Sequence, residues 1–173
     1  EGRAVCQWQK VTLNGKLDWN EYKMPYRFLW ANQQFKLEDM RIDEATTLLG
    51  RLDLAARDNS ELIFHFQDES IMHFLQAMGP SKKASMTGKF TGELAFRGNM
   101  LDPDIKGLLD LRSGTLKGIP FREGKIELNG KFPKIFLDRS VVYIKKDMPL
   151  SLNGFIDLSE TDVFKNVTSE MNA

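Results

Sequence analysis

The stretch 86–111, MTGKFTGELAFRGNMLDPDIKGLLDL, limits most strongly what this chain can fold into. Its first half alternates apolar residues or glycine with polar residues at a period of two, which is typical of a β-strand with one apolar face and one solvated face. Turn residues follow at 99–103, where Asp102-Pro103 cannot continue a ladder of hydrogen bonds. Ile105 then begins a second alternating strand. We therefore expect a hairpin-like unit here and variations on it along the chain.

The same alternation predicts strands in most other segments, and Asn14-Gly15 predicts a hairpin turn. A change of parity near Asp39 indicates a β-bulge, and a bend is expected near Arg139-Ser140. Residues 20–24 read as a polar loop. Beyond the unit above, strands are expected at 4–13, 16–19, 26–30, 35–42, 48–54, 62–66, 125–129, 131–138, 141–145 and 150–158. About a dozen strands make the fold class all-β.

Only the segment 69–78 has helical spacing, with apolar residues at i, i+3, i+4 and i+7. Asp68 or Ser70 can cap its start, and Gly79-Pro80 ends it. A helix this short must dock on apolar surface to be stable. We divide the chain into an N-terminal β segment at 1–85 that includes the helix, a β repeat at 86–158 and a polar tail at 159–173, with the boundary in the linker-like residues 81–85.

One phrase recurs four times: apolar, any, Gly, any, apolar, Asp, apolar. Its glycines are Gly15, Gly50, Gly107 and Gly154. Each glycine shares the parity of the apolar positions and so lies on the apolar face, where it lets the strand bend and coil. The Asp is expected to point to water. Any antiparallel sheet with one buried face can also reuse such a phrase.

The totals exclude several classes of function. Twenty-four basic and twenty-four acidic residues cancel, which removes the charge footprint of a nucleic-acid binder. The lone Cys6 excludes an internal disulfide framework and a cysteine-rich zinc site. No apolar run reaches the roughly 20 residues that span a bilayer.

We expect no catalytic residues, no metal and no cofactor. His65 falls on the less apolar face of a strand and His73 on the helix, and no Ser or Cys motif accompanies them, so nothing indicates a triad. Asp102 and Asp104 flank Pro103, but the spacing of a calcium loop is absent and a solvated turn explains them.

The run GELAFRGNMLDPDIKGLLDLRSGTLKGIPFREGKIELNGKFPKIFLDRSVVYIKKDMPLSLNGFIDL resembles repeats of the TamB and AsmA-like proteins (translocation and assembly module). The family pattern is a strand ending in Gly, a Pro-containing turn, a strand with Gly-x-apolar, a Gly-Ile-Pro-Phe segment and further strand pairs. The positions that match in order are Gly98, Pro103, Gly107, Gly118-Ile119-Pro120-Phe121, Gly124, Gly130 and Gly154.

The resemblance implies a long, curled, antiparallel-rich sheet that forms an open apolar groove, a β-taco. It also implies a role outside enzymology: a periplasmic groove segment of an inner-membrane-anchored envelope protein, which carries phospholipid acyl chains between the two membranes or serves outer-membrane biogenesis. The resemblance implies that an outer-membrane barrel protein is a partner, through regions outside this chain. It does not imply nucleic acid as a partner.

The residues expected to line this lipid groove are the apolar members of the alternating strands. They are Leu52, Leu54, Phe90, Leu94, Phe96, Ile105, Leu109, Leu111, Ile126, Leu128, Leu150, Leu152, Ile156 and Leu158. The alternative is a closed β-sandwich or jelly roll with a structural or carbohydrate-binding role, in which these residues fill a dry core and Trp8, Trp19 and Trp30 lie exposed on the polar face.

Overall fold

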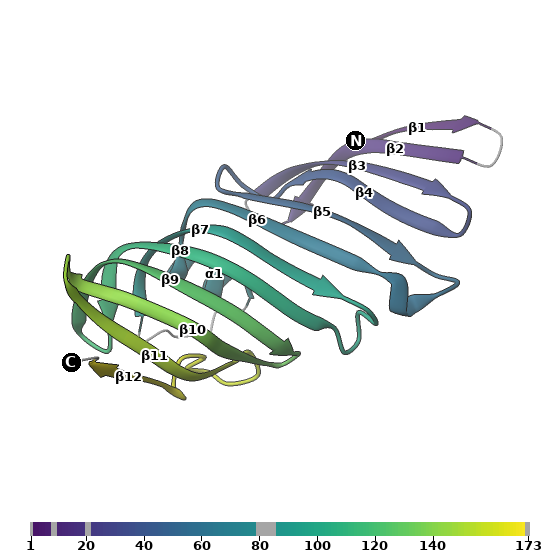
Figure 1. The fold of residues 1–173 in the computed structure, drawn as a ribbon. Coiled ribbons are helices and arrows are strands. Elements are labelled where there is room, and N and C mark those ends of the chain that lie inside the picture. Colours follow the sequence, from purple (N-terminus) through teal and green to yellow (C-terminus); the bar gives the residue numbers. More distant parts are fainter. Residues whose placement is uncertain (1, 8–9, 20–21, 79–85, 172–173) are drawn as a thin grey trace.

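In the computed structural model, which describes residues 2–7, 10–19, 22–78 and 86–171, the chain forms one sheet of twelve strands. Each strand pairs antiparallel with the next one along the chain, so the spatial order is β1 to β12 (Figure 1). The strands are β1 Gly2–Gln7, β2 Lys10–Trp19, β3 Tyr22–Ala31, β4 Gln34–Arg41, β5 Thr46–Asp53, β6 Glu61–Ser70, β7 Met86–Arg97, β8 Asp104–Leu116, β9 Ile119–Lys131, β10 Lys134–Lys145, β11 Met148–Asp157 and β12 Val167–Met171. The expected all-β fold with an open, curled sheet is confirmed.

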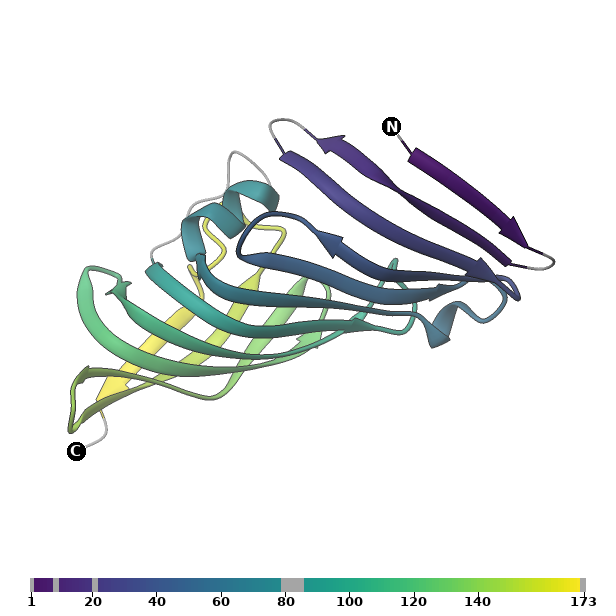
Figure 2. The ribbon, with the colours of Figure 1, turned by 90° about the horizontal axis from the view of Figure 1, so that it is seen from above.

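The sheet curls strongly at its C-terminal end and extends away at its N-terminal end (Figures 1 and 2). Register shifts interrupt the ladders between Phe66 and Glu69 in β6, between Thr87 and Lys89 in β7, and within β10. Such bulges add local twist and bend the strands that carry them. The edge strands β1 and β12 do not pair with each other. The alternative of a closed sandwich is therefore wrong for the described residues, because one open sheet contains all their strands.

Two irregularities were predicted correctly, the bulge near Asp39 and the bend near Arg139-Ser140. The register slips where Arg27 pairs with Asp39 and the next residue, Phe28, pairs with Leu37. The two strands expected at 131–138 and 141–145 form one strand from Lys134 onward, β10, which bends around Arg139, whose φ is 47°, while Lys131 ends β9.

Local turn signals were less dependable. Asn14-Gly15 lies inside β2, where Asn14 pairs with Arg3 on one side and Arg27 on the other. Pairing on both sides holds this segment extended, which overrides its turn propensity. The expected strand at 4–13 is two strands, and the expected loop at 20–24 overlaps the start of β3 at Tyr22. Leu54, predicted to belong to a strand, follows the end of β5 and is 60% exposed.

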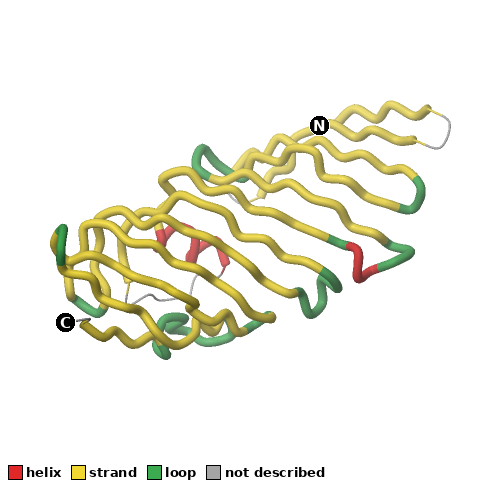
Figure 3. Tube along the Cα trace, in the orientation of Figure 1, coloured by secondary structure: helices red, strands yellow, loops and turns green. Residues whose placement is uncertain are grey.

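The helix α1, Ile71–Met78, and a single 3-10 turn, η1, Arg57–Asn59, are the helical elements of the described chain (Figure 3). Ser70 caps α1, since its Oγ accepts a hydrogen bond from the backbone N–H of His73 at 3.4 Å. The buried residues Ile71 and Leu75 dock α1 on the apolar face of the sheet. The predicted helix stop at Gly79-Pro80 and the linker 81–85 lie outside the described residues.

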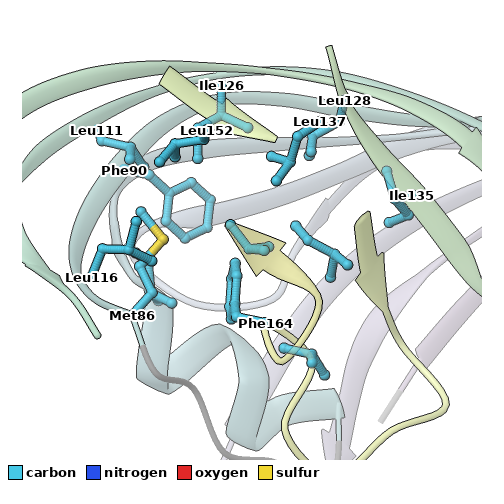
Figure 4. Packing of buried hydrophobic residues seen from close by; sticks show 14 of the residues in the cluster. Met86, Phe90, Leu111, Leu116, Ile126, Leu128, Ile135, Leu137, Leu152 and Phe164 are labelled. Atoms are coloured by element: carbon cyan, nitrogen blue, oxygen red, sulfur yellow. The ribbon is translucent and has the colours of Figure 1, made fainter. Parts of the chain in front are cut away.

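The segment 159–173 differs from the expected polar tail. Val163 and Val167 are almost fully buried, Phe164 is 7% exposed, and all three belong to the main hydrophobic cluster. Figure 4 shows Phe164 inside the curl with Met86 and Phe90. Three apolar side chains in a polar stretch therefore help to fill the concave side of the C-terminal strands.

The Asp of the recurring phrase has two different environments. Asp110 is exposed, as expected. Asp53 and Asp157 are each 7% exposed and end their strands, and there Asp53 Oδ1 accepts the backbone N–H groups of Ala55 and Ala56. The prediction that this Asp points to water is wrong for these two copies, because an Asp at a strand end caps the following turn. The side chain of Asp18 lies outside the described residues.

Candidate apolar binding face

One row of residues crosses the sheet from β2 to β11 and is apolar or glycine at every position. Residues that are directly opposite in an antiparallel ladder point to the same side, so the row belongs to one face. The apolar row is Leu13, Phe28, Leu37, Gly50, Leu62, Phe96, Ile105, Gly130, Ile135 and Ile156. It runs across the strands, along the length of the sheet.

The C-terminal part of this face is filled by protein. Of the predicted groove residues, nine are buried: Phe90, Leu94, Ile105, Leu111, Ile126, Leu128, Leu150, Leu152 and Ile156. They pack with α1 and with Val163, Phe164 and Val167 in one cluster. Phe96, Leu109 and Leu158 are partly buried against that cluster. In this structure the nine buried residues contact protein and offer little surface to a ligand.

The N-terminal part of the same face is less covered, although Met24 and Leu37 on it are buried. We call the rest of this part the open apolar face, and its residues are half-buried: Leu13, Tyr26, Phe28, Trp30, Phe35, Met40, Leu48, Leu52, Leu62 and Phe64. Among these only Leu52 was predicted to line the site. The alternation of Tyr26, Phe28 and Trp30 was the signal that could have identified the rest.

Aromatic rings stack along this face. The centroids of Tyr26 and Phe28 lie 4.8 Å apart, and those of Phe28 and Phe35 lie 4.6 Å apart. Trp30 continues the series beside Phe35, at 6.4 Å. Trp30 thus lies on the apolar face, contrary to the polar-face position that the sandwich alternative required. The side chains of Trp8 and Trp19 lie outside the described residues.

Charged side chains gather on the opposite face. Arg27 and Lys36 both contact Glu38 there, at 3.0 and 3.6 Å. A shallow hollow of about 1050 Å³ on this polar face is lined by both signs of charge, including His65, Glu93 and Lys106. His65 Nδ1 lies 3.3 Å from Glu93 Oε2. Charges that pair with each other across neighbouring strands do not select a ligand of either sign.

The remaining polar candidates have local explanations or belong to a separate cluster. Asp102 binds the ammonium of Lys131 at 2.8 Å, and this hydrogen bond, more than the charge attraction that accompanies it, raises the pKa of Lys131. Asp104 begins β8 and is exposed. His73 lies beside Glu69 and Asp43, a grouping that the sequence did not indicate because its members come from three different elements.

No helix among the described residues is both long enough and apolar enough to cross a membrane. In comparisons with known proteins, the chain matches no family model, no curated protein and no solved structure.

Proposed function

We propose that this chain is a non-enzymatic lipid-binding segment, which holds acyl chains on its open apolar face. The observation that carries the proposal is the apolar row, which is unbroken over ten strands and only partly covered. Soluble monomers rarely leave a contiguous apolar surface of this kind without a partner. The resemblance to TamB and AsmA-like repeats favours a lipid as that partner and the periplasm as the location.

The chemistry of the face suits acyl chains better than a ligand with polar groups. Its members are aliphatic or aromatic side chains that share one side of neighbouring strands, while the charges of Arg27, Lys36 and Glu38 lie on the other face. Each methylene that moves from water onto such a surface contributes about 0.8 kcal/mol. A tail can therefore bind without a polar anchor, and it can shift along the row because every position offers similar contacts.

The proposal places binding in β2–β6 and assigns a structural role to most of the residues first expected in the groove. α1 lies against β6 and β7, at the boundary between the open face and the filled half (Figure 2). The C-terminal half then serves as a folded support for the open half.

The experiment is a titration of the delipidated protein with a fluorescent polyene fatty acid, together with native mass spectrometry of the protein as purified from bacterial cells. The test variant is Leu48→Gln with Leu62→Gln, which places two amides on the open face. The matched control is Leu49→Gln with Ile63→Gln, a directly paired couple from the same two strands on the opposite face.

We expect saturable binding by the natural protein and the control, and at least about tenfold weaker binding by the test variant, which corresponds to about 1.4 kcal/mol. Co-purified phospholipid would add support. A natural protein that carries no lipid and takes up no probe would overturn the proposal, as would equal weakening by both double variants.

A further inference from the structure

A second group of side chains lies where β5 begins and β6 ends, beside the N-terminus of α1. Asp43 comes from the turn before β5, Glu69 from the end of β6, and His73 from the first turn of α1. Each offers one ligand atom, and these atoms lie within 4.8 Å of one another. One imidazole nitrogen and two carboxylate oxygens form a common set of ligands for divalent transition metals.

The distances fit a shared ion. His73 Nδ1 lies 2.8 Å from Glu69 Oε1 and 3.9 Å from Asp43 Oδ2. Ligand atoms around a tetrahedral ion with bonds of about 2.0 to 2.2 Å lie roughly 3.3 to 3.6 Å apart. The first distance is shorter than that range and the second is longer, and all three atoms lie within 4.8 Å of one another. A shared ion therefore requires side-chain rotations that separate His73 from Glu69 and bring it closer to Asp43.

Both carboxylates are already oriented by groups that are not ligands. Asp43 Oδ1 accepts the backbone N–H groups of Ala45 and Thr46, at 2.8 and 2.7 Å, and this leaves Oδ2 directed to His73. Glu69 Oε2 accepts the hydroxyl of Thr46 at 2.6 Å, and its Oε1 accepts the backbone N–H of Ser70 at 2.8 Å. Outer hydrogen bonds that fix the ligating carboxylates are a regular feature of metal sites.

Charge and burial favour a cation in the same place. Glu69 is 3% exposed, and the residue paired with it on β7 is the buried Phe90. A buried carboxylate is stable when it is paired with positive charge or coordinates a metal. Two carboxylates against one imidazole leave an excess of negative charge, which a divalent cation balances. His73, with 37% of its side chain exposed, leaves the cluster open to entry from solvent.

We propose that Asp43, Glu69 and His73 bind one divalent transition-metal ion of the Zn²⁺ type, with water completing the coordination. The ion joins the turn between β4 and β5 to α1. It thereby holds α1 in place at the boundary between the open apolar face and the filled half. The site is independent of lipid binding, because none of its three ligands belongs to the open apolar face.

The test is calorimetric titration of the chelator-treated full chain with zinc chloride, alongside His73→Gln and Asp43→Asn. The amide oxygen that Asp43→Asn introduces can still accept the turn N–H groups, and residue 73 is partly exposed, so both variants are expected to fold; circular dichroism checks this. The matched control is His65→Gln, which removes the other histidine, also beside a carboxylate but outside the cluster.

We expect one ion per chain, binding at least about tenfold weaker in each test variant, unchanged binding in the control, and a zinc-dependent rise in melting temperature that is absent in His73→Gln. Absence of binding by the natural protein, or retention of full affinity by His73→Gln, would overturn the proposal. Loss of affinity in His65→Gln equal to that in His73→Gln would also overturn the proposal.

Fatty-acid uptake by the zinc-free protein reports on the open apolar face separately, so failure of the zinc proposal is distinguishable from failure of the lipid proposal.

Discussion

The ring of Phe74 in α1 meets the ring of Phe66 in β6 edge-on, with centroids 5.2 Å apart and an interplanar angle of 80°. Phe90 of β7 completes the group, 5.9 Å from Phe74 and 4.9 Å from Phe66. These rings attach α1 to the sheet. They also mark the place where the open part of the apolar face ends and the filled part begins.

Replacing Phe74 with Ala should detach α1 in part and destabilise the protein. An eight-residue helix has little stability of its own, and Phe74 is only half-buried, so we expect a loss of about 2 kcal/mol, below the usual range for a fully buried Phe. Urea unfolding measures the loss, and hydrogen exchange should speed up in 71–76. Gln76→Ala, at an exposed position of the same helix, is the control and should change stability little. Equal effects of the two substitutions would contradict this account.

The burial of Phe164 leads to a second prediction about the C-terminal segment. Phe164→Ala should cost about 3 kcal/mol, because it leaves a cavity among side chains that cannot fully collapse. Phe136→Ala is the comparison, since Phe136 is 53% exposed and lies beside Phe155 on the face opposite to the apolar row. Its cost should be below about 1 kcal/mol. The unfolding midpoints in urea decide, and a Phe164 variant as stable as the Phe136 variant would mean that the segment does not support the core.

The faces of individual strands could be predicted from the sequence because alternation depends only on neighbouring residues. Phe90, Leu94, Ile105 and Ile126 all lie on the predicted side of the sheet. What alternation could not predict is which part of that side is covered. Coverage depends on Val163 and Phe164, which follow the strands they pack on and sit in a stretch that reads as polar.

The cluster of Asp43, Glu69 and His73 escaped prediction for a different reason. The bulge between Phe66 and Glu69, where Asp68 has a φ of 57°, shifts the parity of β6 at its end. The carboxylate of Glu69 therefore lies on the side of Thr46 and α1. Strict alternation would instead have placed Glu69 with His65, on the polar face. A period-two argument fails beyond a bulge unless the bulge itself is recognised.

The close approach of β7 and β8 makes Gly92 hard to replace. Its φ is 152°, a backbone angle that other residues rarely adopt, and a Cβ added there would overlap the carbonyl oxygen of Leu108. Gly92→Ala should therefore destabilise by about 3 kcal/mol or more, through overlap with backbone that cannot move away cheaply. Gly98 allows the cost of backbone strain to be measured without the cost of steric overlap. Its φ is 87°, but nothing lies within 4 Å of its would-be Cβ. Gly98→Ala should cost only the backbone strain, about 1 to 2 kcal/mol. Thermal unfolding compares them, and a larger loss at Gly98 would contradict the packing argument.

The free energy of unfolding should depend on pH through Asp53. The backbone N–H of Ala56 and, next, the side-chain amide of Gln34 stabilise its carboxylate and lower its pKa below the ordinary value of 3.8. A carboxyl whose pKa is lower in the folded chain than in the unfolded chain contributes stability above the unfolded value, and this contribution is lost as the pH falls through the folded value. Asp53→Asn should thus be less stable than the natural protein near neutral pH, and this difference in stability should shrink below about pH 4.

Urea midpoints from about pH 7 to about pH 3 measure the gap in stability between the two proteins, with Asp58→Asn in the exposed turn η1 as the control. A gap that stays constant over this range would show that Asp53 stabilises the end of β5 through turn geometry alone, without any contribution from its charge.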